Sequence, residues 1–369
     1  MAFWIGVAQD VVANLLTAAI VAVVVTLAVA VGFSASPRRL WRRLFPRRPD
    51  HRVLVAKTAP AVGATPKFRN RTPFKCPVSP HEQEALVRFY ALMNGSDPFD
   101  GRCVRLDRLA PEAEVSEVGF FDLLATNLTA YSDNIATPGL WLRFSAVRQW
   151  ISLVPVLQQV RQAAKTGGDR LRSVEEALAN PHMANVTAVS VLVMDSNRKA
   201  AIVQRQSRLA VSSGQFGTTA AGTVSDKDLS AGDPFLGAAR RELYEETGIE
   251  PESLEFEALV LPVQKMQPIF LYTAHMTKPW QAMASLLEQA TDFHRETAHM
   301  FLLGIDDPKA IASFLATARI TDAAAYHIWL AAKRAAGEHA LVSAWRSVRP
   351  WSVFLRTERY LDLLSPKSN

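Results

Sequence analysis

Cysteine is scarce in this sequence, and its scarcity excludes two classes of small protein: those stabilised by disulfide bonds and those stabilised by a structural zinc ion. Cys76 and Cys103 are the only cysteines among 369 residues, and neither belongs to a CxxC pair or a Cys/His cluster. A disulfide framework and a structural zinc site are therefore not indicated. This usage of cysteine favours a reducing compartment.

Acidic residues are nearly absent from one basic segment, whereas the rest of the chain lacks an excess of positive charge. Residues 38–75 contain twelve Lys or Arg and a single acid, Asp50. The formal net charge of the whole chain is only +6. Residues 76–369 are therefore mildly acidic, which argues against a general nucleic-acid binder, and no specific nucleic-acid partner is expected.

A long stretch near the N-terminus contains no charge at all. Residues 11–33 contain no charged residue and are mostly apolar, and at ~1.5 Å per residue such a helix can cross a ~30 Å hydrocarbon layer. The alternative is a cleaved secretory signal, but residues 1–10 lack the Lys or Arg that such a signal has before its apolar run. Since the basic residues follow directly, the positive-inside rule predicts a single-pass anchor over residues 1–37, with the remainder in the cytoplasm.

The remaining chain divides into four expected regions. A basic, proline-rich juxtamembrane linker without a core is followed by a mainly helical accessory region, whose first helix begins at the capping signal Ser79-Pro80-His81-Glu82. Further helical patterns lie around 115–131 and 143–164. A strand-rich domain and a C-terminal helical region complete the chain, and the four regions cover residues 38–78, 79–182, 183–310 and 311–369.

Strand patterns begin after residue 185. Val186–Met194 and Lys199–Gln206 are apolar and separated by the turn residues Asp195-Ser196-Asn197, which predicts a hairpin. Three more strands are expected farther along, at Leu254–Gln264, Pro268–Met276 and His299–Ile305. Helices are then expected to begin at Asp307-Pro308 and at Thr321-Asp322.

One stretch, Gly222 to Glu250, carries the chemistry. Asp233-Pro234 supplies an N-cap and a first-turn proline, and Gly248 is placed for a left-handed C-terminal cap, so a helix is expected over Pro234–Thr247. Three carboxylates then project from one side of this helix: Glu242, Glu245 and Glu246. Ala239 and Leu243 would form the adjacent apolar stripe.

Like charges crowded on one helix face repel one another, and a divalent cation removes that penalty. Hard oxygen ligands at this spacing suit Mg²⁺ or Mn²⁺. Arg241 can pair with a carboxylate and hold it in a ligating orientation, and Gly222 permits a loop backbone to approach a phosphate closely. A salt-bridged surface helix without a metal is the plain alternative.

These residues resemble the Nudix box of Nudix hydrolases, which reads Gly, five residues, Glu, seven residues, Arg-Glu, aliphatic, one residue, Glu-Glu, one residue, Gly, aliphatic. Arg241-Glu242-Leu243-Tyr244-Glu245-Glu246-Thr247-Gly248-Ile249 matches the second half. Gly222 and Asp233 stand eleven apart where the family has six. The box at 222–249 is therefore expected to contain an enlarged loop before Asp233, with Asp233 in place of the usual Glu.

The resemblance implies a Nudix-type α/β/α sandwich with a mixed sheet, and a role for each acid. Glu242, Glu245 and Glu246 would bind Mg²⁺ or Mn²⁺, and Arg241 would orient one of them. A metal-polarised water would then attack phosphorus in a nucleoside diphosphate linked to another moiety. The general base is open between a box glutamate and the later acids Glu288, Asp292 and Glu296, of which Glu296 ranks first.

Two arginines after the hairpin, Arg205 and Arg208, are candidates for contact with substrate phosphate, and simple solvation is equally open for both. The sequence thus predicts a membrane-anchored Nudix-type hydrolase of a phosphorylated small molecule. The alternative function, favoured by the enlarged loop, is a non-catalytic nucleotide-sensing or scaffold module at the membrane. A Nudix-like isomerase that uses a cysteine of the domain is disfavoured, because both cysteines precede residue 183.

Overall fold

A computed structural model describes most of the chain beyond its N-terminal part. The described residues are 53–56, 66–68, 74–94, 100–109, 112–131, 144–165, 173–206, 212 and 214–348. The apolar segment 11–33 and the anchor predicted from it lie outside these ranges. Within them, no helix combines the length and apolar character needed to cross a bilayer.

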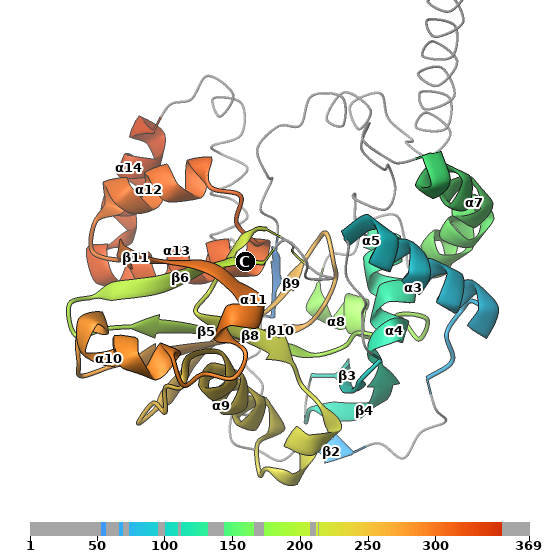
Figure 1. Cartoon of the computed structure of the whole chain (residues 1–369), viewed down its shortest axis with the longest axis horizontal. Coiled ribbons are helices and arrows are strands. Elements are labelled where there is room, and N and C mark those ends of the chain that lie inside the picture. Colours follow the sequence, from blue (N-terminus) through green and yellow to red (C-terminus); the bar gives the residue numbers. More distant parts are fainter. Residues whose placement is uncertain are drawn as a thin grey trace, which may run out of the picture. The chain divides into compact units, whose positions relative to one another are not determined.

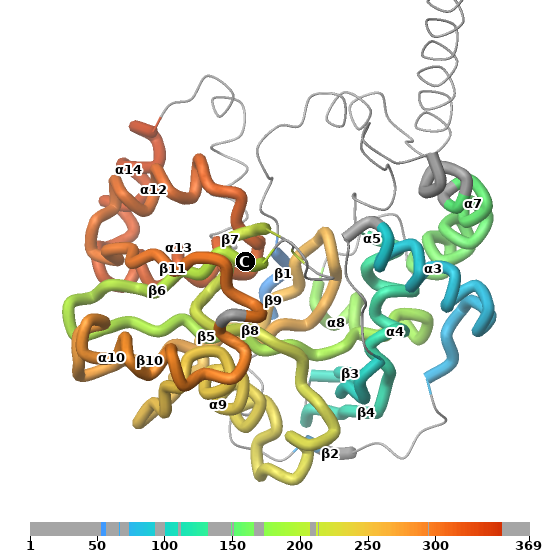
Figure 2. Tube along the Cα trace, viewed as in Figure 1, coloured from blue at the N-terminus to red at the C-terminus, as the bar shows by residue number. Residues whose placement is uncertain are grey.

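The larger sheet is mixed and mostly antiparallel (Figure 1). Its strands follow the order β1 (Val53–Val55), β9 (Leu254–Pro262), β10 (Ile269–His275), β5 (Ala188–Met194), β6 (Lys199–Arg205) and β11 (Thr297–Gly304). Two short strands lie off this path, β7 (Phe216–Gly217) beside β6 and β8 (Ala220–Thr223) beside β5, and the tube in Figure 2 follows both. Within this sheet β5 and β10 run parallel, while every other pair of described strands is antiparallel.

The expected hairpin β5–β6 is present because its turn is stabilised by an aspartate. The Asp195 carboxylate accepts hydrogen bonds from the backbone N–H groups of Asn197 (2.9 Å) and Lys199 (2.8 Å). Such a side-chain bond to the backbone two residues on is the Asx-turn that makes aspartate a turn residue. The predicted strands after residue 250 are also found, with ends shifted by a few residues.

Both faces of the sheet are covered by helices, since the buried residues of the central strand alternate between two cores. Val189, Val191 and Val193 belong to the core shared with α9 (Pro234–Thr247) and α10 (Trp280–Leu287). Ala188 and Leu192 belong to the opposite core, with α12 (Pro308–Thr317), α13 (Asp322–Ala336) and α14 (Glu338–Ser347). The predicted mixed α/β architecture is thereby confirmed.

The region before the hairpin combines helices with a small sheet. Its helices are α3 (Pro80–Asn94), the consecutive turns α4 (Phe120–Leu123), η1 (Leu124–Leu128, a π-helix) and α5 (Thr129–Tyr131), then α7 (Phe144–Ala164) and α8 (Val174–Leu178). The sheet has the order β2 (Lys67–Phe68), β4 (Glu114–Gly119), β3 (Arg102–Arg108).

Two expectations from the sequence are wrong in detail. The helical pattern expected from residue 115 begins only at Phe120, because Val115 and Val118 are buried on strand β4, where β-branched side chains pack well. The linker expected over residues 38–78 was predicted to have no core, yet β1 pairs with β9 and Val53 is buried. A three-residue apolar run among basic residues and prolines is too short to show a period.

Candidate functional site

Helix α9 begins and ends at the residues that the caps predicted. The Asp233 carboxylate accepts hydrogen bonds from the N–H groups of Phe235 (3.0 Å) and Leu236 (3.1 Å), and Pro234 occupies the first turn. At the other end Gly248 adopts φ +69°, and its N–H donates to Tyr244 O. The αL cap suits glycine, which has no Cβ penalty there.

The helix buries its apolar stripe and two of its three glutamates. Ala239 and Leu243 are fully buried in the core beneath the sheet, as expected. Among the acids, Glu246 is buried and the Glu242 side chain is only 14% exposed, whereas the Glu245 side chain is 38% exposed. The acids therefore face the protein around strand β8 and do not extend into bulk solvent.

Strand β8 meets two of these glutamates through its backbone. Ala221 N–H donates to Glu246 Oε1 over 3.0 Å. Next to it, Gly222 leaves the space that the Glu242 carboxylate fills, since a Cβ at this position would lie 2.0 Å from Glu242 Cδ. Residue 222 must therefore be glycine if the Glu242 carboxylate is to occupy this position.

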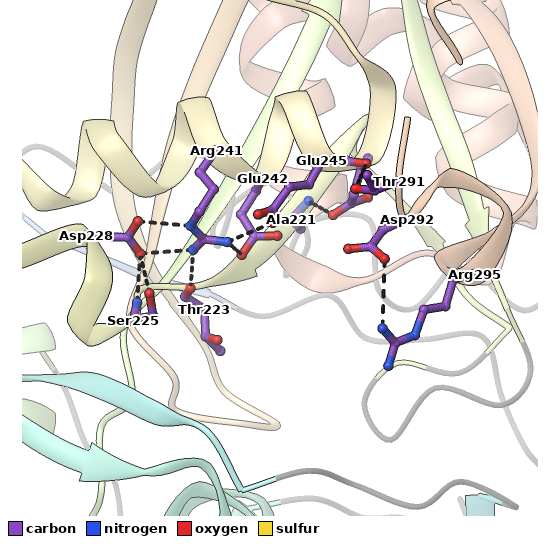
Figure 3. A network of polar contacts seen from close by, with 11 residues as sticks. Ala221, Thr223, Ser225, Asp228, Arg241, Glu242, Glu245, Thr291, Asp292 and Arg295 are labelled. Carbon is purple, nitrogen blue, oxygen red and sulfur yellow. Dashed lines mark hydrogen bonds and ion pairs between the residues drawn. The ribbon is translucent and has the colours of Figure 1, made fainter. Parts of the chain in front are cut away.

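Arg241 connects the acids to one another (Figure 3). Its Nη1 donates to Glu242 Oε1 (2.8 Å) and to Glu245 Oε2 (3.0 Å). Its Nη2 donates to the Thr223 carbonyl at the end of β8 (3.1 Å). The guanidinium therefore pairs with two box carboxylates, Glu242 and Glu245.

Sequence reasoning missed the acid that holds Arg241 from the other side. Asp228 lies on the short 3₁₀ helix η2 (Asp226–Ser230), whose N-cap is Ser225. The backbone N–H and the hydroxyl of Ser225 both donate to Asp228 Oδ2. The two Asp228 oxygens accept from Arg241 Nε and Nη2, each over 2.9 Å, which is the bidentate geometry that arginine favours. Figure 3 shows Asp228 and the box glutamates on opposite sides of this guanidinium.

The position of Asp228 corrects the expected place of the inserted residues. Asp228, not Asp233, stands six residues after Gly222, the spacing between the glycine and the acid in the Nudix box. The extra residues therefore follow this acid and precede the helix, and Asp233 caps the helix. The spacing from Gly222 was the signal that could have found Asp228.

Burial and mutual repulsion disfavour the ionised form of the two inner glutamates. Burial raises the pKa of Glu242 to about 7 against the opposing effect of Arg241, with Glu245 and Glu296 adding to the rise. Burial also raises the pKa of Glu246 well above its usual range, and Glu296 contributes again. A bound cation would offset this concentration of negative charge.

Glu296, the first-ranked general base, lies close to the box glutamates. It ends the short helix α11 (Phe293–Glu296), and its Oε2 is 3.4 Å from Arg205 Nη2. Arg205 also acts electrostatically on Glu246. The other candidate bases differ, since Glu288 is exposed and Asp292 forms a 3.8 Å ion pair with Arg295. Arg208 lies outside the described residues.

The residue types gathered at this site suit a divalent cation, but the present arrangement of their side chains does not form a metal site. Carboxylate oxygens of the kind gathered here are the ligands that Mg²⁺ and Mn²⁺ take, and buried Glu242 and Glu246 lack a full complement of positive charge. Over the described part of the chain, however, no three Asp, Glu, His or Cys side chains converge closely enough to hold an ion. Arg241 engages two of the carboxylates instead.

A family model and several solved structures are similar to parts of this chain. Residues 184–292 match the family model described as the NUDIX domain. No curated protein matches the chain. Similar solved structures include DR0079 from Deinococcus radiodurans, with 16% identity and a TM-score of 0.30 over 45% of this chain and 88% of that chain. At such scores the likeness carries no conclusion about activity.

Two further solved structures are similar at the same level. The MutT protein from Methanosarcina mazei Go1 has 12% identity and a TM-score of 0.28, with 40% of this chain and 93% of that chain covered. NrtR from Shewanella oneidensis, solved in complex with a 27mer DNA, has 14% identity and a TM-score of 0.29, with 48% and 82% covered.

Proposed function

Residues 184–292 of this chain are a Nudix domain, and from this premise we propose that the chain hydrolyses a pyrophosphate bond in a nucleoside diphosphate linked to another moiety, with Mg²⁺ or Mn²⁺ as cofactor. A Nudix hydrolase-like function follows from the domain itself. The observation that carries the proposed activity is that Glu246 is buried and Glu242 is largely covered, both packed against β8 beside Arg241. A helix that only displayed charge to solvent would not bury them.

Each acid would have a distinct part in this reaction. Glu242, Glu245 and Glu246 would hold the cation, which when bound polarises water and neutralises charge on the leaving phosphate. Arg241 would keep Glu242 and Glu245 oriented, and Asp228 would keep Arg241 in place. For that to happen, the carboxylates must give up part of their contact with Arg241, and the bidentate bond to Asp228 lets Arg241 remain when they do.

The remaining groups would act on the water and the substrate. Glu296 would accept the proton of the attacking water, and its electrostatic effect on Glu242 and Glu246, whose pKa values it helps to raise, supports this role. Arg205 lies beside Glu296 with its side chain 17% exposed. Its charge would bind a substrate phosphate.

The proposal includes a location at a membrane. The apolar segment 11–33 and the basic residues after it support a single-pass anchor that keeps the Nudix domain in the cytoplasm. Reversing the charge of Arg38, Arg39, Arg42 and Arg43 and measuring protease accessibility in membrane vesicles tests this. An orientation that does not change would contradict the topology.

A substrate screen tests the activity. The full-length chain is incubated with nucleoside-diphosphate-linked compounds and Mg²⁺ or Mn²⁺, and phosphorylated products are measured. We expect turnover with at least one class of compound, and loss of it in the double variant Glu245→Gln, Glu246→Gln. Glu250→Gln is the matched control, because this exposed glutamate lies outside the helix. Absence of turnover across the library would refute the enzymatic proposal.

A non-catalytic nucleotide-sensing or scaffold module at the membrane is the second candidate. The observation that favours it is that Arg241 already engages Glu242 and Glu245, while no ready-made metal cluster exists among the described residues. Calorimetry separates the two candidates. Nucleotide binding with intact nucleotide recovered afterwards, in the presence of Mn²⁺, would favour the sensor over the enzyme.

A further inference from the structure

Strand β3 of the small sheet forms backbone hydrogen bonds with the Nudix domain. Val104 N–H donates to Val224 O (2.9 Å), and Val104 O accepts from Thr187 N–H (2.7 Å). Val224 N–H in turn donates to Thr187 O (2.9 Å). Val104, Thr187 and Val224 therefore close a ring of three backbone hydrogen bonds, and all three residues are fully buried.

Strand β3 supplies partners that the Nudix strands cannot supply to each other. The ladder between β5 and β8 ends at the pair of Ala188 and Thr223, so Thr187 and Val224 stand one residue beyond it. Backbone N–H and C=O groups that are buried need partners. Without Val104, the carbonyl of Val224 and the N–H of Thr187 would each lose one, at the point where the chain leaves the sheet.

The residues on either side of Val224 both support Arg241 (Figure 3). Before it, the Thr223 carbonyl accepts from Arg241 Nη2 over 3.1 Å. After it, Ser225 donates through its N–H (2.8 Å) and its hydroxyl (3.0 Å) to Asp228 Oδ2. Asp228 in turn binds the guanidinium through both of its oxygens. A shift of Val224 would therefore move two partners of Arg241 at once.

Strand β3 can act as a fixed support because it is itself attached to the chain that leads into β5. The buried Arg105 side chain donates from Nε to Met183 O and from Nη2 to Asn180 O, each over 3.2 Å. Leu106 N–H donates to Asn185 O over 3.2 Å. These bonds leave β3 little freedom to follow a movement of the loop after β8.

We propose that Val104 is a positioning residue for the pair of Arg241 and Asp228. Its bond to Val224 O holds the loop after β8 in place, and that loop keeps Arg241 between Asp228 and the box glutamates. The catalytic consequence of this role rests on the proposed function. Val104 lies outside residues 184–292, which match the family model, so the accessory region becomes part of the framework of the site.

Removing the N–H group of residue 104 tests this role in the full-length chain. The valine is replaced by its α-hydroxy acid, which puts an ester in place of the amide and keeps the side chain. The matched control is the same change at Leu106, which is equally buried but donates its N–H to Asn185 O. Amide hydrogen exchange over residues 221–228, followed by mass spectrometry, reports on the loop.

The ester at Val104 should speed exchange over residues 221–228 by about two- to tenfold, the factor that corresponds to one lost buried hydrogen bond. The ester at Leu106 should leave exchange over these residues unchanged. A purely structural role would lower the melting temperature of both variants and speed exchange evenly across the domain. Equal exchange over residues 221–228 in the two variants overturns the positioning role.

Turnover separates this role from the proposed function. If the wild type hydrolyses a substrate, the ester at Val104 should lower kcat about tenfold or more, because Arg241 no longer keeps the carboxylates in place, and should leave KM within about twofold. Faster exchange in this variant without turnover in the wild type contradicts the enzymatic proposal alone. Turnover in the wild type with kcat retained in the ester at Val104 contradicts the positioning role alone.

Discussion

Gly222 and Glu242 share one space: a Cβ on Gly222 would lie 2.0 Å from Glu242 Cδ and 2.1 and 2.2 Å from its two carboxylate oxygens. Contacts this short are impossible, so any side chain at residue 222 must displace the glutamate. A glycine of the box thereby sets the orientation of a carboxylate of the box. Because Gly222 is paired with Val189 of β5, strand β8 has little freedom to move away from the glutamate.

Gly222→Ala should impair the site more than it impairs the fold. Displacing Glu242 by about an ångström should cost about 100-fold in kcat, the scale expected for misplaced catalytic geometry. Overpacking should lower the free energy of unfolding by about 1–3 kcal/mol. Steady-state kinetics and urea denaturation measure the two effects. Gly232→Ala is the matched control, because a Cβ there would meet nothing within 4 Å; equal kcat in both variants would contradict the packing argument.

Asp228→Asn tests whether the inserted segment supports the box. This change removes the charge of a buried partner that binds Arg241 through two 2.9 Å hydrogen bonds. We expect the free energy of unfolding to fall by about 2–3 kcal/mol, and kcat to fall because Arg241 no longer holds Glu242. Asp226→Asn, on the same short helix, should stay within about 0.5 kcal/mol of the wild type. A variant Asp228→Asn with wild-type stability and kcat would show that Arg241 is held by the glutamates alone.

Within the box, helix α9 could be predicted from the sequence more fully than the loop that precedes it. Helix α9 has a cap at each end, a proline in its first turn and an apolar stripe, so its limits and its buried face followed from local rules. The loop before it contains three aspartates that could each be the box acid: Asp226, Asp228 and Asp233. The spacing of six residues from Gly222 favours Asp228, and the contact with Arg241, which is distant in sequence, identifies it.

Other parts of the fold and of the site were also beyond local rules. Strand β1 owes its structure to the exposed edge of β9, with which it pairs. The roles of Glu242, Glu245, Glu246 and Glu296 stay predictions, because no three acidic side chains of the described residues converge closely enough to hold an ion.

The variant Glu246→Gln tests the charge of the proposed metal ligand Glu246, because glutamine keeps the shape of the side chain and removes its charge. The glutamine oxygen can still accept the hydrogen bond from Ala221 N–H, so the fold should persist, and without metal the variant should be at least as stable as the wild type, because a buried carboxyl is replaced by a neutral group. The wild type should gain thermal stability as Mn²⁺ is added, since a ligand bound to the folded state stabilises by RT ln(1 + [L]/Kd).

That gain should be largely absent in Glu246→Gln and intact in Glu250→Gln, whose glutamate is exposed. Differential scanning fluorimetry over a series of Mn²⁺ concentrations measures it. If Mn²⁺ stabilises Glu246→Gln as strongly as the wild type, Glu246 is not a ligand.

His327 should make the fold sensitive to acid on the face of the sheet opposite the glutamates. It is fully buried on α13, and its Nε2 lies 3.0 Å from Thr273 Oγ1. Because the Thr273 hydroxyl donates its single hydrogen to Glu257 (2.7 Å), Nε2 is the donor toward Thr273. Burial lowers the pKa of His327 to about 3, with Arg334 contributing.

In the unfolded chain this histidine has an ordinary pKa near 6.5. Between about pH 6.5 and pH 3 it is therefore protonated in the unfolded chain but not in the folded chain. Stability from this group is complete above pH 6.5 and falls as the pH is lowered, by about 2 kcal/mol at pH 5. Urea denaturation at pH 7 and pH 5 should show this loss in the wild type and in His339→Gln, whose histidine is exposed. His327→Gln should be less stable at pH 7 but should lose about 2 kcal/mol less between the two pH values. An unchanged difference in His327→Gln would mean that other groups cause the acid sensitivity.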